Sequence, residues 1–278
     1  MISTSTLITV IITFIISAIL PLVVWIAYGI KNKGKGVWTA WLLGAAGFFI
    51  MQVIIRIPIL NMISLTAGFQ AFVENQYVLY CFVAAFTAAL FELIGRYVVA
   101  KIMAKNLTYE RCFAAGLGHG GIEAIIIIGM TYLNNMLYIG MINSGAFDSI
   151  VEQTAALGVD TASLVAIKDA LINTHSAVFL LAGYERILTM IFHLAMSLIV
   201  CYFVSKKQDI KGILICLICH FMVDFISPLL NGMATKYLGN VISQTTAYIM
   251  VYVFMTAVAV AAVVTILNIR KKWNLSRN

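Results

Sequence analysis

Three pairs of polar side chains recur at a spacing of four residues in otherwise apolar stretches of the chain. Each pair joins a carboxylate to an arginine or a histidine, and this spacing places both side chains on one face of an α-helix, about one turn apart. Carboxylate and imidazole groups held together can activate a water molecule, either as general acids and bases or as ligands of a divalent metal. The pairs are Glu92 with Arg96, His119 with Glu123, and His220 with Asp224.

A fourth apolar stretch carries His193 and the adjacent residues Glu185 and Arg186. Arg186 and His193 are seven residues apart and therefore share a helix face. Each of these groups has a structural alternative, because a buried ion pair or a hydrogen-bonded histidine can simply fix helix packing. That alternative fits Glu185 and Arg186 best, and we assign them a supporting role. Helix packing alone does not account for the number of other ionisable residues in these apolar stretches. Their number favours a functional site.

The surrounding sequence is typical of a membrane protein. Of its 278 residues, 62% are hydrophobic and 10% are charged, whereas roughly 25% of residues are charged in soluble proteins. Stretches of about 20 apolar residues can cross a bilayer as helices. The sequence therefore predicts an all-α, polytopic integral membrane helix bundle that forms a single domain over residues 1–278. The seven predicted transmembrane helices cover residues 7–30, 37–60, 77–104, 111–133, 180–204, 210–230 and 243–268.

Basic residues mark one side of this predicted bundle. The connections after the first, third and fifth helices, together with the carboxyl-terminal tail, hold 13 of the 18 lysines and arginines. The positive-inside rule predicts an external amino terminus and a cytoplasmic carboxyl terminus in the cell membrane. No basic residue precedes the first apolar stretch, so we expect a permanent helix rather than a cleaved signal. The basic residues behind the net charge of +7 then serve to orient the protein in the membrane and to contact the lipid bilayer. We therefore expect no nucleic-acid partner.

The longest polar break in the chain is residues 134–179, which we expect to form an outer loop. Its regularly spaced apolar residues predict short helices that lie at the membrane surface. This segment could be a plain connector, or it could form a lid over a cavity that opens outward.

The ionisable residues fall on the third to sixth predicted helices, mostly at a similar depth. An unpaired charge at the bilayer centre costs about 2.5–3.5 kcal/mol, so these charges must face one another or water. Counting about 1.5 Å per residue from the helix centres predicts one compact polar layer, with most of its members within about 5 Å of the midplane. The members closest to the midplane are Glu92, His119, Glu123, His193 and His220.

Glycines are concentrated around His119. Residues without a side chain at these positions could allow close approach of a neighbouring helix, or could leave space for water and substrate beside the imidazole. The glycines are Gly116, Gly118, Gly120 and Gly121.

Four motifs on successive predicted helices resemble one known family. The segments "FELIGR", "GLGHGGIEA", "ERILTMIFHLAMS" and "HFMVDF" occur in this order. As a set they resemble the YhfC family of intramembrane proteases, which is related to the CAAX-protease and bacteriocin-processing (CPBP, Abi) group and to PrsW. The resemblance spans about residues 85–228. It implies a catalytic core made of the third to sixth helices.

The resemblance also implies roles for individual residues. Glu92 with Arg96 matches the first motif, and His119 matches the second. The glutamate and this histidine are then expected to activate water. His220 with Asp224 matches the last motif and is expected to complete the site for the oxyanion. His193 falls on the less regular third motif.

The match departs from the family pattern in two places. The usual glutamate pair is reduced here to Glu92, which lies four rather than five residues before Arg96 and is therefore turned by about 100° around the helix. The aromatic residue expected four positions before His119 is Ala115. Because of these departures, Glu123 competes with Glu92 for the role of general base.

These observations predict an intramembrane endopeptidase that cleaves a membrane-embedded peptide or protein, by a glutamic-type or a metal-assisted mechanism. A transporter or a scaffold that binds an ion, a proton or a small solute in the same layer is the alternative, although the two chain halves show no duplicated polar pattern. A haem carrier is a third alternative, which the acids beside the histidines disfavour. The sequence specifies neither the substrate nor the oligomeric state. A divalent metal such as zinc could be held by His119, Glu123, His193 and His220.

Overall fold

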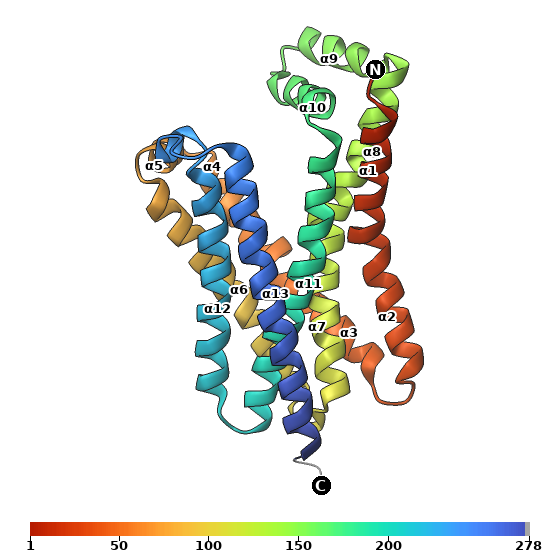
Figure 1. Cartoon of the computed structure of the whole chain (residues 1–278), viewed down its shortest axis with the longest axis vertical. Coiled ribbons are helices and arrows are strands. Elements are labelled where there is room, and N and C mark those ends of the chain that lie inside the picture. Colours follow the sequence, from red (N-terminus) through yellow and green to blue (C-terminus); the bar gives the residue numbers. More distant parts are fainter. Residues whose placement is uncertain (276–278) are drawn as a thin grey trace. The chain divides into compact units, whose positions relative to one another are not determined.

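The computed structural model describes residues 1–275, and every regular element within them is a helix (Figure 1). Seven helical stretches in this range are long and apolar enough to cross a membrane. The predicted all-α, seven-span architecture is therefore confirmed, although several helix ends differ from the predicted ones, most of all the end of the fourth span. The spans are Thr4–Lys31, Val37–Ser64, Tyr77–Ile102, Tyr109–Ser144, Ser176–Ser205, Asp209–Gly232 and Gln244–Leu275.

The chain divides into two compact units. The larger unit contains Val24–Glu123 and the chain from Leu188 onward, and the smaller unit contains Met1–Val23 and Ala124–Ile187. The single domain predicted over residues 1–278 stays a prediction, because it concerns how the two units act together.

The larger unit contains most of the helical elements. These are α2 (Leu20–Lys31) from Val24, α3 (Val37–Phe48), the π-helical segment η2 (Phe49–Arg56), α4 (Ile57–Ser64), α5 (Ala67–Asn75), α6 (Tyr77–Ile102), the 3₁₀ turn η3 (Ala104–Asn106), α7 (Tyr109–Glu123), α11 (Ser176–Ser205) from Leu188, α12 (Asp209–Gly232), the 3₁₀ turn η5 (Lys236–Leu238) and α13 (Gln244–Leu275).

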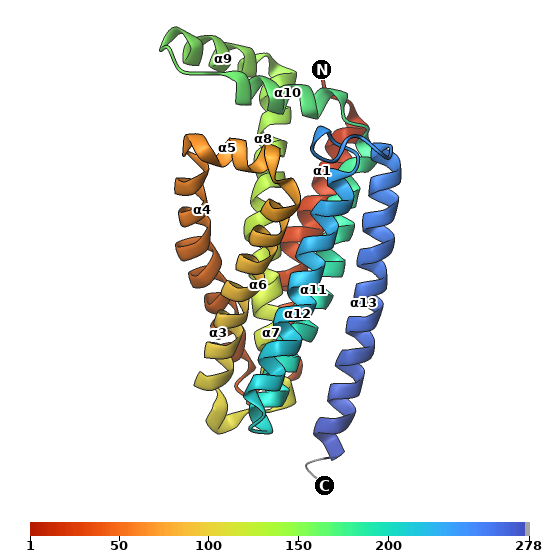
Figure 2. The ribbon, with the colours of Figure 1, turned by 90° about the vertical axis from the view of Figure 1, so that its left-hand side faces the viewer.

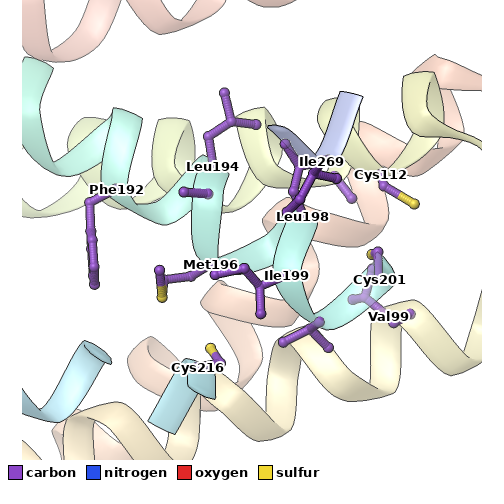
Figure 3. Close-up of a cluster of buried hydrophobic side chains, with 14 of the residues drawn as sticks. Val99, Cys112, Phe192, Leu194, Met196, Leu198, Ile199, Cys201, Cys216 and Ile269 are labelled. Atoms are coloured by element: carbon purple, nitrogen blue, oxygen red, sulfur yellow. The ribbon is translucent and has the colours of Figure 1, made fainter. Parts of the chain in front are cut away.

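The core of the larger unit surrounds the second half of α11. Residues around nearly the whole circumference of this segment are buried, including Leu194, Leu198 and Ile199. Figure 3 shows these side chains with Cys112 of α7 and Cys216 of α12 around them. A helix that is apolar on all sides is stable only when other helices enclose it. The second half of α11 is therefore the element around which the larger unit packs.

The other helices of the larger unit pack in neighbouring pairs. Helix α3 packs on α7 and α6, and α6 packs on α12. Helix α13 packs on α12, and Figure 2 shows the two running alongside each other. Together with the apolar core around α11, these contacts place α6, α7, α11 and α12 around one interior. This arrangement is needed to bring the ionisable residues of four helices together.

Glycines permit the close approach of α3 and α7. A Cβ atom on Gly118 would lie 2.1 Å from the carbonyl oxygen of Trp41, and one on Gly44 would lie 1.9 Å from the carbonyl oxygen of Ala115. A Cβ atom on Gly116 would lie 2.7 Å from a methyl carbon of Leu194. Of the two explanations for the glycines near His119, close helix packing accounts for Gly116 and Gly118.

The smaller unit is built around a second apolar cluster. Ile2, Val10, Tyr132, Ile139 and Leu171 are buried together in it. Its elements are α1 (Thr4–Phe14), the π-helical segment η1 (Ile15–Ile19), the first residues of α2, the π-helical segment η4 (Ala124–Gly129), α8 (Met130–Ser144), α9 (Ala146–Ala156), α10 (Ala162–Asn173) and α11 as far as Ile187.

The boundaries of the outer loop, predicted at residues 134–179, need correction. The fourth span continues to Ser144 and the fifth begins at Ser176. Helix α8 continues because Ile139 packs into the apolar cluster and Asn143 Oδ1 accepts a hydrogen bond from the Ile2 amide at 2.7 Å. It ends at Gly145, whose φ of 80° is the left-handed conformation that favours glycine. The shorter connection contains two short helices, α9 and α10, where short helices were predicted.

Three spans contain π-helical segments among the described residues. π-Helical segments are rare in proteins, and those that occur often lie near functional sites. Two of them border the polar residues, because η2 contains Gln52 and η4 begins directly after Glu123. Both therefore set the direction of side chains near the predicted polar layer.

We expect Gly118→Ala to destabilise the protein by about 1–3 kcal/mol, because the added methyl group overlaps backbone that has no room to move. Thermal unfolding of the purified protein in detergent would measure the effect. Gly140→Ala on α8 is the matched control, since no atom lies within 4 Å of a Cβ atom there. Equal melting temperatures for the two variants would contradict the close packing of α3 on α7.

Candidate functional site

Glu92 lies at the centre of the polar residues in the larger unit. It projects from α6, and its side chain is 8% exposed. Its Oε2 accepts hydrogen bonds from Arg96 Nη2 at 3.0 Å and from His119 Nε2 at 3.1 Å. Its Oε1 accepts a hydrogen bond from Gln52 Nε2 at 3.0 Å. Residues from η2, α6 and α7 are thus joined through one carboxylate.

Arg96 extends this network to two further helices. Its Nη2 donates to His193 Nδ1 on α11 at 2.5 Å, and its Nη1 donates to His220 Nδ1 on α12 at 3.3 Å. A guanidinium group has donors and no acceptor, so the Nδ1 atom of each neutral imidazole must accept and its Nε2 must carry the proton. Arg96 therefore fixes the tautomer of both histidines in this arrangement.

The Nε2 atoms of these histidines face two more carboxylates. His193 Nε2 lies 2.8 Å from Glu123 Oε2, and His220 Nε2 lies 3.3 Å from Asp224 Oδ2. His193 Nδ1 and His220 Nε2 each lie 3.6 Å from Glu92 Oε2. The two imidazoles thus connect Glu92 to Glu123 and to Asp224.

The network is almost completely enclosed. The side chains of Glu92, Arg96, His119, His193 and His220 are each at most 8% exposed. Opposite charges at such a depth must be paired, because an isolated buried charge is very unfavourable. The more exposed side chains are Glu123 at 13% and Asp224 at 30%. Any approach of a reactant from outside the larger unit would therefore meet these two acids first.

Aromatic rings form part of the wall. The Phe48 ring meets His119 edge-on with centroids 5.3 Å apart. The Phe192 ring does the same with both His193 and His220, each at 5.6 Å. Apolar walls of this kind exclude bulk water and strengthen the electrostatic interactions inside.

The structure brings all seven residues of the predicted catalytic set into one connected group in the larger unit. Their catalytic roles stay predictions. Glu185 and Arg186 belong to the smaller unit, where Arg186 Nη2 donates to Glu185 Oε1 at 2.5 Å. This is the mutual ion pair expected for them, and their supporting role in a site stays a prediction.

Gln52 was not predicted as a site residue. This residue is 3% exposed, and besides Glu92 it contacts Arg56, whose Nη1 donates to Gln52 Oε1 at 3.2 Å. Arg56 Nη2 also donates to the Ala84 carbonyl oxygen at 2.8 Å. Gln52 and Arg56 have the same four-residue spacing as the other pairs, and this signal could have identified them.

Ser197 of α11 was also missed. Within residues 1–275, its Oγ and the Nε of Arg96 have no hydrogen-bond partner, although both atoms are buried. Both residues line a small cavity with His119, of about 10 Å³. This is close to the smallest volume that accommodates one water molecule. A single water between Arg96 and Ser197 would satisfy both groups.

Four residues present donor atoms close enough to hold a metal ion. One donor atom from each of Glu92, His119, Glu123 and His193 lies within 4.8 Å of every other. In a tetrahedral zinc site with bonds of about 2.1 Å, donor atoms are roughly 3.4 Å apart. The distances of 3.1 Å between His119 and Glu92 and 2.8 Å between His193 and Glu123 are near this value. Two imidazoles and carboxylate oxygens are also ligand types that zinc prefers.

This donor group differs in one member from the ligands named by the sequence analysis. It contains Glu92 in place of His220, whose Nε2 lies 3.6 Å from Glu92 Oε2 and 3.3 Å from Asp224 Oδ2. His220 is thus next to the group and turned toward Asp224.

Comparison with known families identifies the family of this chain. Residues 16–243 match the family model described as YhfC intramembrane metalloprotease. The chain belongs to the YhfC family. The matched range contains Glu92, Asp224 and every other member of the predicted catalytic set. The predicted family is thereby confirmed, whereas its wider relationship to the CPBP group and PrsW stays a prediction.

A curated relative of this YhfC-family chain is the Bacillus subtilis (strain 168) protein named "Uncharacterized membrane protein YhfC". It is 30% identical over 174 residues, which are 62% of this chain and 63% of the relative. The match thus spans less than two thirds of the relative's length. No solved structure matches the chain. Together these findings establish a multi-pass membrane protein of a metalloprotease family with a buried Glu/His cluster that fits a metal.

We expect Arg96→Met to destabilise the protein by about 3–5 kcal/mol, because it leaves the Glu92 carboxylate buried without its cation. The double variant Glu92→Gln with Arg96→Met removes both charges and should recover much of this loss. Thermal unfolding in detergent would measure both variants.

The control for this comparison is Lys101→Met, which breaks the exposed ion pair with Asp209. It should change the melting temperature little, because exposed pairs contribute little to stability. If the double variant melted no higher than Arg96→Met, the interpretation of Arg96 as the cation that neutralises Glu92 would be wrong.

Proposed function

We propose that this chain is a metal-assisted intramembrane endopeptidase. The observation that carries the proposal is the meeting of two histidines and two glutamates, from three helices, with donor atoms within 4.8 Å. The site lies on spanning helices and inside the protein, which suits hydrolysis of a peptide bond in a membrane-embedded substrate. The family description as an intramembrane metalloprotease supports this reaction class.

His119, His193 and Glu92 would hold the ion, which we propose to be zinc. Ligation through either nitrogen of His193 would replace the hydrogen bond that its Nδ1 accepts from Arg96 Nη2. Catalytic zinc sites commonly use three protein ligands, and two histidines with one glutamate is a known set. When bound, zinc would polarise the scissile carbonyl group and lower the pKa of a water molecule. Arg96 and Gln52 hold the Glu92 carboxylate in place by hydrogen bonds, as residues around metal-binding carboxylates commonly do.

We assign the role of general base to Glu123. Glu92 accepts hydrogen bonds from Arg96, His119 and Gln52, which suits a fixed ligand. The Glu123 carboxylate is the more exposed of the two and lies 2.8 Å from His193 Nε2. It can take a proton from the attacking water and pass it to the leaving amine.

Arg96 and His220 would stabilise the oxyanion. The guanidinium group of Arg96 is a fixed positive charge in a water-poor interior, where such charges are most effective. His220 keeps an N–H group toward the carboxylates because Arg96 occupies its Nδ1. Asp224, 3.3 Å from His220 Nε2, orients that imidazole. These are the same roles that the family resemblance suggests for His220 and Asp224.

The orientation in the membrane is part of the proposal. The positive-inside rule favours an external amino terminus and a cytoplasmic carboxyl terminus. The basic connections after the first, third and fifth spans support this orientation.

We expect the purified protein to bind about one zinc ion per chain, measured by elemental analysis after dialysis against zinc buffer. His119→Ala and His193→Ala should each weaken binding by about 10- to 100-fold or more. His175→Ala is the control, because His175 is exposed in the loop before α11 and should leave binding unchanged. Equal zinc content in all three variants would place the metal elsewhere.

We expect Glu123→Gln to lower cleavage of a membrane-embedded peptide in proteoliposomes by about 100-fold, because the general base is lost, while zinc remains bound. Glu92→Gln should lower zinc affinity as well as cleavage. If zinc were lost only from the Glu123→Gln variant, Glu123 would be the metal ligand and Glu92 the general base. Chelator-sensitive solute flux without any cleavage would favour the transporter alternative and overturn the peptidase.

A further inference from the structure

A large apolar groove lies on the larger unit, and none of the four donor residues lines it. Its volume is about 610 Å³, within the range of roughly 300–1,000 Å³ that is usual for ligand pockets. Residues of α11, α12 and α13 line it, for example Met196, Met222 and Val258. Most of its lining is therefore apolar.

One end of the groove is positively charged. Lys272 lines it directly, near the end of α13. Tyr202 and Phe203 line it at the end of α11. The ammonium group of one further lysine lies over each of these two rings. Lys206 Nζ lies 5.8 Å from the centroid of the Tyr202 ring, and Lys211 Nζ lies 5.3 Å from that of Phe203. Lys272 thus lines this end, and Lys206 and Lys211 lie against rings that line it.

These three lysines have no acidic partner within residues 1–275. Other lysines of the larger unit do have one, since Lys101 pairs with Asp209 and Lys35 with Glu110. Asp209 is at the start of α12, yet its carboxylate is held by Lys101 and by Tyr97. No acidic side chain among the described residues therefore neutralises the charge at the end of the groove.

We propose that this groove binds an anionic phospholipid of the surrounding bilayer. An acyl chain would lie against the apolar wall, and the phosphate group would be bound by Lys206, Lys211 and Lys272. Clusters of lysine next to a membrane helix attract anionic lipid headgroups. A transmembrane peptide would use the apolar wall equally well, but it gives no reason for three unneutralised lysines at one end.

The groove also reaches the wall of the polar site. Phe192 lines the groove, and its ring is 5.6 Å from the rings of His193 and His220. A bound acyl chain would therefore contact the residue that packs on both imidazoles. The lipid site itself does not depend on the proposed peptidase function, and it can be tested without any substrate.

The test uses the full-length protein in detergent micelles, titrated with dioleoyl phosphatidylglycerol or with dioleoyl phosphatidylcholine, and native mass spectrometry to count bound lipid. We expect preferential retention of phosphatidylglycerol. The triple variant Lys206→Gln, Lys211→Gln, Lys272→Gln should lose this preference by roughly tenfold or more. The matched control is Lys31→Gln, Lys33→Gln, Lys105→Gln, three exposed lysines that do not line the groove.

Two outcomes would overturn the proposal. One is equal retention of the two lipids by the unaltered protein. The other is an equal loss of phosphatidylglycerol in both triple variants, which would indicate attraction by overall charge. All six lysines are exposed, so both variants should fold, and size-exclusion chromatography checks this.

A second pair of variants tests the apolar part of the groove. Ala261→Phe places a ring in the groove and should reduce retention of both lipids several-fold. Val260→Phe is the control, because Val260 is 60% exposed on the same helix and does not line the groove. If phosphatidylglycerol were retained by Ala261→Phe while a photoreactive transmembrane peptide lost its crosslink to α13, the groove would be a peptide site and the proposal would be wrong.

Discussion

The pairing of Arg96 with Glu92 in an apolar interior is the interaction on which the site depends. One guanidinium group donates to Glu92 on its own helix, to His193 on α11 and to His220 on α12. It neutralises the central carboxylate and also sets the tautomer of two imidazoles, because it has no acceptor atom. A lysine could supply the charge, but its single ammonium group could not match this planar set of donors. The helices around α11 are therefore joined by hydrogen bonds as well as by apolar contacts.

Much of this arrangement could be predicted from the sequence because the bilayer restricts the alternatives. Apolar length identified the seven spans, and the four-residue spacing identified Glu92 with Arg96 and His220 with Asp224, which do contact each other. Spacing along one helix does not say which residue on another helix a side chain meets. That His119 reaches Glu92 on α6, and that Glu123 reaches His193 on α11, follows from the packing of α7 between its neighbours.

The residues that were missed share one property. Gln52 and Ser197 are uncharged, so neither stands out in an apolar span, although both are buried beside Glu92 or Arg96. The outer boundary of the fourth span was misplaced for a related reason. Asparagines in α8 suggest a polar loop, whereas one of them, Asn143, is bonded to the amino-terminal backbone. In each case a tertiary partner, which composition does not reveal, satisfies the polar group.

The π-helical segment η2 has a consequence for how this family can vary. A π-helical turn contains one more residue than the α-helical turn that it replaces. Deleting one residue between Phe49 and Arg56 would restore regular winding and leave the rest of the span facing as before, because each kind of turn completes one rotation. The side chains inside the turn would be redistributed around the helix axis, and Gln52 would lose its present direction toward α6. In relatives without the extra residue of this turn, we therefore expect the side-chain amide that donates to the central glutamate to lie on another helix. Otherwise, one oxygen of that carboxylate should be hydrogen-bonded to water.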